Sequence, residues 1–264
     1  MKNNHVLVVP YPAQGHVIPL MDAAQRFTRK GLKVTFVNTE DSHKRVINAW
    51  SQKDDLGDMM QMVAIPDGIE PWEDRNNLGQ LTESMFRAMP DKLEELINNI
   101  NKTDDDKITC IIADYCMGWI SKVAQKMGIR LAVFCSGSAA VMAVFMSVQK
   151  LLDDQVIDSN GVPVKDQMVQ LSTNMPPMDP KQFLWACIGD PVTNKKMFDG
   201  LGLEASEPRN ITTFAATLET HRGNVVAKRV AVGVTNLSHD AIFVTTRVTH
   251  LMDVAFLVAI GVAI

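Results

Sequence analysis

Short apolar runs rich in β-branched residues alternate with helical patterns over the first two thirds of the chain. Most positions within each run are apolar, which is typical of strands buried on both faces of a parallel sheet. The alternation predicts βαβ units, and therefore a Rossmann-like α/β domain with a doubly wound, mostly parallel sheet. The predicted strands are Val6–Pro10, Lys33–Asn38, Met60–Ile65, Thr109–Ala113 and Arg130–Phe134.

Two helices stand out between these strands. Apolar residues recur at helical spacing from Val17 to Phe27, and Gly31 lies where a C-terminal cap is expected. A longer helix is predicted over Leu81–Ile100, and Pro90 is expected to break or kink it. Residues 53–80 have the composition of a long loop with a strand inside it, and residues 153–180 are similarly loop-like. Such loops at the edge of an α/β sheet are expected to form walls of a binding site.

The last sixty residues have a different character. From about Glu204 the alternation fades into Thr-, Val- and Ala-rich sequence that ends in an apolar run at 255–264. That run is shorter than the roughly 20 residues of a membrane helix, so a buried strand or a poorly packed terminus is favoured over an anchor. The predicted division is an N-terminal domain at 1–203 and a divergent tail at 204–264.

Composition and charge narrow the class of protein. The chain has 264 residues, 46% of them hydrophobic and 21% charged, as expected of a globular protein. A net charge of −4 argues against nucleic acid as a partner, because binding phosphates requires a basic face. The four cysteines lack metal-binding spacing and are expected to be buried free thiols. The N-terminal apolar run is too short for a signal peptide, so a cytoplasmic protein that binds no membrane is predicted.

The first strand-to-helix turn contains the first candidate for chemistry. A single glycine, Gly15, precedes the helix, so neither a dinucleotide-binding GxGxxG turn nor a P-loop is present. His16 follows it, at the carboxyl edge of the predicted sheet, where ligands bind in open α/β folds. The helix dipole disfavours a protonated imidazole there, so His16 is suited to accept a proton. A histidine that only caps the turn is the alternative, and position alone leaves both open.

Asp114 directly follows a predicted strand and is expected at the same edge of the sheet. A carboxylate there would hydrogen-bond the imidazole of His16, select its tautomer and stabilise the imidazolium. An aspartate that caps the following helix is the alternative. A catalytic pair requires the two side chains within about 3 Å of each other, so geometry decides between them.

Several stretches resemble a known family, including Pro-Tyr-Pro-Ala-Gln-Gly-His at 10–16 and Ala-Asp-Tyr-Cys-Met-Gly-Trp at 113–119. The similarity keeps its order and spacing from residue 5 to about residue 200, and it is to plant UDP-glycosyltransferases of glycosyltransferase family 1. These enzymes have the two-domain GT-B fold, and the chain resembles their N-terminal, acceptor-binding half. The matching segments are His5–Leu20, Val34–Glu40, Ile65–Gly68, Cys110–Trp119, Phe134–Ser136 and Gln170–Pro176.

The resemblance implies an inverting transfer of a sugar, glucose first among the candidates, from a UDP-sugar co-substrate to a hydroxyl or carboxyl group. His16 matches the general base and Asp114 its partner. Ser136 matches a residue near the donor sugar, and Gly15 would allow close approach of the acceptor. The implied acceptor is a phenolic, terpenoid or hormone-like small molecule of plant secondary metabolism, and no metal or further cofactor is implied.

An apolar acceptor pocket is implied as well. Core packing is the favoured interpretation for most of its candidate lining residues, which are Met85, Phe86, Met89, Met142, Phe145 and Met146.

The chain also departs from the family pattern. The His-Cys-Gly-Trp-Asn-Ser run of the donor-binding domain does not occur, and the family's strand after residue 200 is not recognisable. Without those contacts the UDP-sugar would lose most of its binding and its electrostatic stabilisation, which usually supply much of the rate enhancement. The sequence therefore predicts little or no transfer by these residues alone. A non-catalytic small-molecule-binding module is the alternative, and a nicotinamide-dependent reductase is disfavoured by the single-glycine turn.

Overall fold

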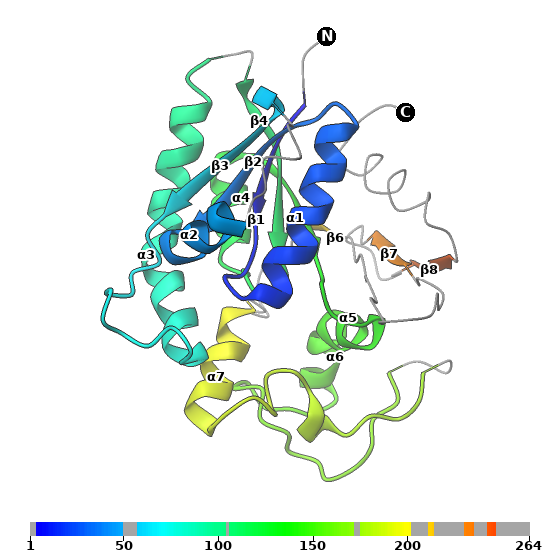
Figure 1. The fold of residues 1–264 in the computed structure, drawn as a ribbon. Coiled ribbons are helices and arrows are strands. Elements are labelled where there is room, and N and C mark those ends of the chain that lie inside the picture. The colour runs from blue at the N-terminus through cyan, green and yellow to red at the C-terminus, as the bar shows by residue number, and fades with distance from the viewer. Residues whose placement is uncertain are drawn as a thin grey trace.

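A computed structural model describes residues 4–49, 57–103, 106–171 and 175–201, together with three short strands further on. Its centre is a six-stranded parallel sheet in the order β3-β2-β1-β4-β5-β6 (Figure 1). All five predicted strands are confirmed, with ends that shift by one residue at most. The strands are β1 (His5–Val9), β2 (Lys33–Thr39), β3 (Met60–Ile65), β4 (Ile108–Asp114), β5 (Arg130–Phe134) and β6 (Ile211–Thr213).

β6 was not among the strands predicted from sequence, and the absence of the family's sequence pattern after residue 200 stays untested by it. It pairs in parallel with β5, with Leu131 opposite Ile211. Its sequence, Ile-Thr-Thr, is β-branched throughout, which suits a short strand at the edge of a sheet. A separate antiparallel pair is formed by β7 (Val230–Val234) and β8 (Ile242–Thr246). The remainder of the predicted tail at 204–264 lies outside the described residues, so the domain boundary stays a prediction.

Helices cover both faces of the sheet, as the doubly wound prediction requires. On one face α1 (Gln14–Arg29) and α2 (Glu40–Ala49) lie against the strands, and α1 buries Leu20 and Phe27 beside Phe36 of β2. Gly31 follows the C-terminal cap, Lys30. The other face is covered by α3 (Leu78–Ile100) and α4 (Ile120–Met127). A short 3-10 turn, η1 (Gly57–Met59), precedes β3.

The predicted break at Pro90 is wrong, because α3 runs through this residue. Met85, Met89, Leu93 and Ile97 recur every fourth position and are at most 1% exposed, so one buried stripe extends on both sides of the proline. A proline inside a helix costs roughly 3 kcal/mol, whereas each buried Leu, Ile or Met contributes about 1.5–3 kcal/mol. Burial of the stripe outweighs the loss of one backbone hydrogen bond.

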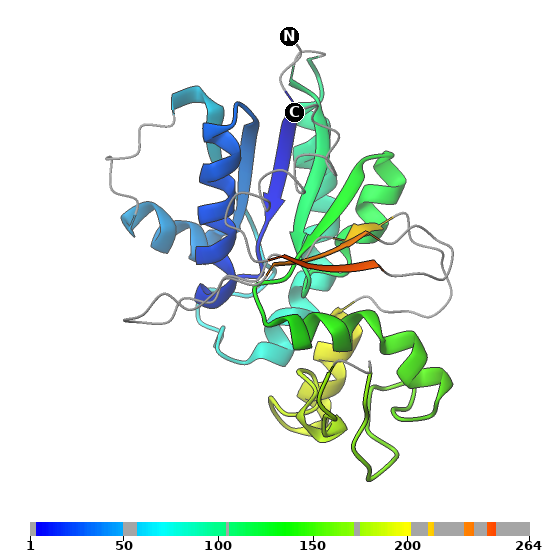
Figure 2. The ribbon, with the colours of Figure 1, turned by 90° about the vertical axis from the view of Figure 1, so that its right-hand side faces the viewer.

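The described residues from α5 to α7 gather at the carboxyl ends of the strands (Figures 1 and 2). They form α5 (Ala139–Met146), α6 (Val148–Asp153), a loop segment with η3 (Pro180–Gln182), and α7 (Pro191–Gly200), which packs on α3. The predicted loop at 153–180 is confirmed over its described part. None of the described helices is both long enough and apolar enough to cross a bilayer.

All four cysteines are free thiols, as predicted, and three of them are buried. Cys187 is exposed, so the expectation of burial is wrong for it. It lies in the segment between residues 182 and 191, before α7 begins.

His5, at the start of β1, is a buried histidine with both ring nitrogens bonded. Its Nδ1 lies 2.7 Å from the Asp106 carbonyl oxygen, to which it donates, and its Nε2 lies 2.8 Å from Thr35 Oγ1, from which it accepts. Burial lowers the pKa of His5 below the ordinary value of 6.5. The neutral ring therefore stabilises the fold fully above the unfolded-state pKa, and this contribution is lost as the pH falls below about 6.5 and through the lower folded-state pKa.

We expect the free energy of unfolding to decrease between pH 7 and pH 5 by more in the parent protein than in His5→Gln. Glutamine removes the titration and retains an amide that can hydrogen-bond. Urea unfolding followed by circular dichroism across this range measures the difference. Parallel pH profiles for the two proteins would contradict the assignment.

Candidate active site

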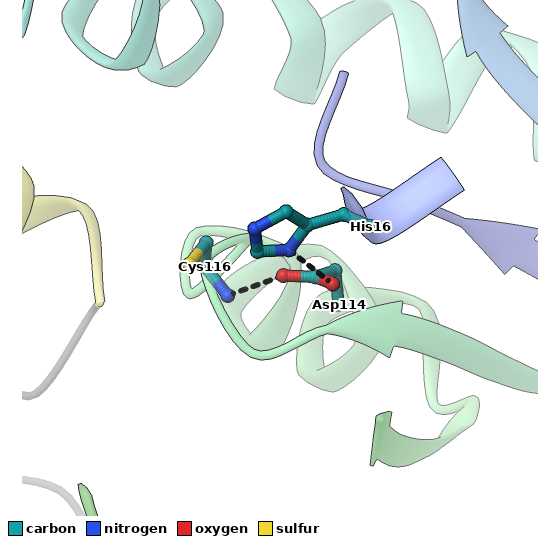
Figure 3. A group of neighbouring side chains, drawn as sticks. All are labelled: His16, Asp114 and Cys116. Carbon is teal, nitrogen blue, oxygen red and sulfur yellow. Dashed lines mark hydrogen bonds and ion pairs between the residues drawn. The ribbon is translucent and has the colours of Figure 1, made fainter. Parts of the chain in front are cut away.

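His16 and Asp114 meet at the carboxyl edge of the sheet (Figure 3). His16 lies in the first turn of α1, and Asp114 is the last residue of β4. His16 Nδ1 lies 2.9 Å from Asp114 Oδ2, which satisfies the distance required of a catalytic pair. The alternative, Asp114 as a helix cap, is not found, since the N-cap of α4 is Trp119. The second carboxylate oxygen instead accepts a hydrogen bond from the Cys116 backbone N–H, at 2.9 Å.

This arrangement determines the orientation of the imidazole. A carboxylate only accepts hydrogen bonds, so the proton between the two residues belongs to His16 Nδ1. Nε2 then has the free lone pair, and it points away from Asp114 (Figure 3). The Asp114 side chain is fully buried, whereas that of His16 is 21% exposed. The pair therefore presents a proton acceptor toward an accessible space and keeps its orienting carboxylate away from water.

Two tyrosines flank the imidazole. The ring of Tyr11 lies 5.3 Å from it in a tilted arrangement, and the ring of Tyr115 is stacked at 5.7 Å. The Tyr11 hydroxyl is 3.1 Å from Thr82 Oγ1, and burial raises the pKa of Tyr11 to about 12, so it stays neutral at physiological pH. The two aromatic rings restrict rotation of His16. Sequence reasoning did not select these tyrosines, although both are close in sequence to the pair: Tyr11 is in the same turn as His16, and Tyr115 directly follows Asp114.

The structure also places the other two predicted site residues near His16. Ser136, just beyond β5, has its hydroxyl 3.4 Å from His16 Nδ1, a longer contact than the one to Asp114. Gly15 is exposed, and a Cβ added there would meet no atom within 4 Å. The space beside Gly15 is therefore open, as close approach of a ligand requires. Contact of Ser136 with a donor sugar and of Gly15 with an acceptor stay predictions.

Cys116 joins His16 and Asp114 in a cluster whose potential metal ligands lie within 4.8 Å of one another. Two of the potential ligand atoms, His16 Nδ1 and Asp114 Oδ2, already form a hydrogen bond with each other. Burial raises the pKa of the Cys116 thiol well above its ordinary value, whereas metals bind the thiolate. The cluster is thus suited to proton transfer, and the implied absence of a metal stays a prediction.

A cavity of about 310 Å³ has Tyr115, whose ring is stacked on His16, in its wall, whereas His16 and Asp114 are not among its lining residues. Phe145 of α5 meets the Tyr115 ring edge-on at 5.9 Å and lines the cavity too. The remaining wall comes from α5, the segment around η3 and the end of α7. Its lining residues are Tyr115, Ala140, Val141, Val144, Phe145, Met178, Asp179, Gln182, Phe183, Leu184, Trp185 and Leu201.

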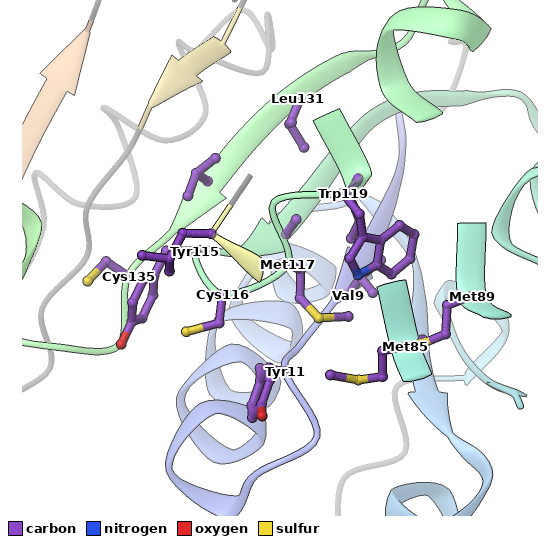
Figure 4. Packing of buried hydrophobic residues seen from close by; sticks show 14 of the residues in the cluster. Val9, Tyr11, Met85, Met89, Tyr115, Cys116, Met117, Trp119, Leu131 and Cys135 are labelled. Carbon is purple, nitrogen blue, oxygen red and sulfur yellow. The ribbon is translucent and has the colours of Figure 1, made fainter. Parts of the chain in front are cut away.

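The pocket candidates from sequence divide as follows. Met85, Met89 and Met142 are 1% exposed and belong to the hydrophobic core, where Met85 and Met89 lie in one cluster with Trp119 (Figure 4). The favoured core interpretation is confirmed for these three methionines. Phe145 lines the cavity instead. The aromatic residues opposite it, Phe183 and Trp185, were not among the candidates.

Comparison with known proteins gives relatives over most of the described chain. UDP-glycosyltransferase 83A1 of Arabidopsis thaliana is 42% identical over 204 residues, covering 75% of this chain and 44% of the relative. Linamarin synthase 1 of Manihot esculenta is 33% identical, with 77% of this chain and 44% of the relative covered. The chain thus spans less than half the length of these relatives. No protein-family profile matches it.

Solved structures share the fold at low sequence identity. The UDP-glucose:anthocyanidin 3-O-glucosyltransferase bound to UDP superposes with a TM-score of 0.56 at 18% identity, over 82% of this chain and 48% of the other. UGT2 of Phytolacca americana, bound to UDP-2-fluoro-glucose and pterostilbene, gives 0.58 at 15% identity, over 83% and 48%. The sheet is therefore that of the N-terminal domain of a GT-B glycosyltransferase. The chain belongs to the plant UDP-glycosyltransferases of family 1 and corresponds to their N-terminal part.

Proposed function

We propose that the chain binds the acceptor and supplies the general base of an inverting, UDP-sugar-dependent glycosyltransferase. The main support is the 2.9 Å hydrogen bond between His16 Nδ1 and Asp114, because it leaves Nε2 available at the carboxyl edge of the sheet. An acceptor hydroxyl would donate its proton to Nε2 while its oxygen attacks the anomeric carbon of a UDP-α-sugar. General base catalysis of this kind contributes about 10²- to 10⁴-fold to the rate.

The bonds in this step balance without a metal or a further cofactor. One bond forms between the acceptor oxygen and the anomeric carbon, and the bond from that carbon to UDP breaks with its electron pair leaving on UDP. Attack from the opposite face gives a β-glycoside. The imidazolium formed on His16 is stabilised by Asp114, whose other oxygen is held by the Cys116 N–H. UDP-sugar is thus a co-substrate, and glucose is the proposed sugar because relatives are named glucosyltransferases.

The proposed acceptor is a hydroxylated or carboxylated small molecule of plant secondary metabolism, and the proposed location is the cytoplasm. The proposal for the acceptor has two supports. The cavity beside His16 is largely aromatic and aliphatic, which is typical of sites for small organic ligands. Fold neighbours include an anthocyanidin glucosyltransferase and a structure that contains pterostilbene.

A second candidate function is binding without turnover. It is favoured by one sequence observation, the absence of the family's His-Cys-Gly-Trp-Asn-Ser run from these 264 residues. We infer that these residues bind UDP-sugar weakly and that efficient transfer requires a donor-binding half. The two functions then describe the same acceptor site, with and without a donor beside it.

A chimera separates the two candidates. Residues 1–201 would be joined to the donor-side half of UDP-glycosyltransferase 83A1, and release of UDP from UDP-glucose would be followed with a panel of phenols. We expect measurable transfer by the chimera, with inversion at the anomeric carbon, and far slower transfer by the chain itself. A folded chimera that binds UDP-glucose and a phenol but releases no UDP above background would favour the binding module.

A further inference from the structure

The polar groups of the cavity are few, and their charge is one-sided. Most of its described wall is aliphatic or aromatic, with Val144, Phe145 and Phe183 among the lining residues. Among the described residues that line it, Asp179 is the only charged one. The described part of the wall therefore offers a negatively charged hydrogen-bond acceptor and no cation.

The Asp179 carboxylate is held in place rather than free to swing away. As the N-cap of η3 it accepts a hydrogen bond from the Lys181 backbone N–H at 2.9 Å. Lys181 is not among the lining residues, and its ammonium pairs with Asp166 at 2.7 Å. The cavity wall therefore has the Asp179 side chain without a lining cation beside it among the described residues. In a partly water-excluded site a second negative charge would be repelled more strongly than in water.

Tyr115 connects this cavity to the catalytic pair. One face of its ring is stacked on His16, its edge meets Phe145, and it forms part of the cavity wall. A ligand whose apolar body occupies the cavity therefore lies next to the residue that contacts the base. The volume, about 310 Å³, is at the small end of the ~300–1,000 Å³ typical of ligand pockets, which suits a body of about two rings.

We propose that this cavity selects neutral, hydroxylated aromatic acceptors and rejects carboxylated ones, with Asp179 as the residue that determines the selection. A hydroxyl of the ligand donates a hydrogen bond to Asp179, whereas a carboxylate in the same position is repelled. The proposal rests on the proposed function for its interpretation of the ligand as an acceptor. The proposed function allows transfer of the sugar to a hydroxyl or a carboxyl group of the acceptor, and this proposal restricts it to a hydroxyl group.

The test compares two probes that differ in one group, 4,4′-dihydroxybiphenyl and 4′-hydroxybiphenyl-4-carboxylate. Isothermal titration calorimetry with the chain, at pH 7.5 and without UDP-sugar, measures the affinity for each. We expect the diphenol to bind about tenfold more tightly or better, since like-charge repulsion disfavours the carboxylate. In Asp179→Asn the ratio should fall to about threefold or less, because the amide is uncharged.

Matched variants complete the experiment. Asp153→Asn makes the same change on the exposed surface of α6 and should keep the ratio of the parent. Val144→Trp should fill the cavity and abolish binding of both probes; if it does not fold, Leu184→Trp serves the same purpose. Equal affinities in the parent, no binding of the diphenol, or an unchanged ratio in Asp179→Asn would each overturn the proposal.

The outcome is separable from the proposed function. Selective binding by the chain together with a chimera that releases no UDP would retain the cavity assignment and reject transfer. Transfer that proceeds equally well to phenols and to benzoates would do the reverse.

Discussion

Replacement of His16 by alanine is expected to lower kcat of the chimera by about 10²- to 10⁴-fold, the usual contribution of a positioned general base. The KM for the acceptor should change little, because the lost interaction is made in the transition state rather than in the ground state. The side chain also bonds the buried Asp114, so a stability loss of about 1–3 kcal/mol is expected. Kinetics are therefore compared at a temperature where unfolding curves show the variant fully folded.

Asp114→Asn isolates the role of the carboxylate. Asparagine has the same shape, but its NH₂ group can donate to Nδ1 and so favour the tautomer with the proton on Nε2, which cannot accept another. We expect a kcat reduction of similar order to that of His16→Ala, and a double variant no slower than the slower single one, since the two residues act as a unit. A decrease of less than about threefold in Asp114→Asn would show that the hydrogen bond orients the ring without contributing to catalysis.

The meeting of His16 and Asp114 was predictable from sequence, because the signals that place them are local. Apolar runs identify β1 and β4, and the carboxyl ends of parallel strands share one edge, so His16 and Asp114 are expected together before any coordinates exist. Their 2.9 Å contact confirms the expectation of geometry. Their chemical roles remain proposals.

The cavity could not be predicted in the same way. Asp179 and Trp185 belong to a segment without helical or strand periodicity, and it reaches the site only by packing over α5 and α7. Met85 and Met89 have the residue type of pocket walls, yet a four-residue repeat buries them in the core. The same repeat carries α3 through Pro90. Local sequence patterns were therefore enough to predict where His16 and Asp114 lie. The wall of the cavity, in contrast, depends on contacts between segments that are distant in sequence.

The loop between β3 and α3 contains a position that is sensitive to a single added methyl group. Gly68 has φ of +77°, and a Cβ there would lie 2.6 Å from Ala88 Cβ and 2.7 Å from Ser84 Oγ, both on α3. The neighbouring Asp67 is buried and bonds Arg75 at 3.0 Å, which holds the two parts of this loop together. The backbone therefore has little freedom to move away from a new side chain.

We expect Gly68→Ala to destabilise the protein by about 2–5 kcal/mol, from about 1–2 kcal/mol for a left-handed alanine and about 1–3 kcal/mol for overpacking against α3. Gly128→Ala is the matched control, since Gly128 has φ of +65° and a Cβ there would meet no atom within 4 Å. It should lose only the conformational part, about 1–2 kcal/mol. Urea unfolding at one temperature measures both. Because whole domains are stable by only about 5–15 kcal/mol, the larger loss in Gly68→Ala should also lower the yield of folded protein. Equal losses of stability at the two positions would contradict the prediction and show that α3 moves to accommodate the added methyl group.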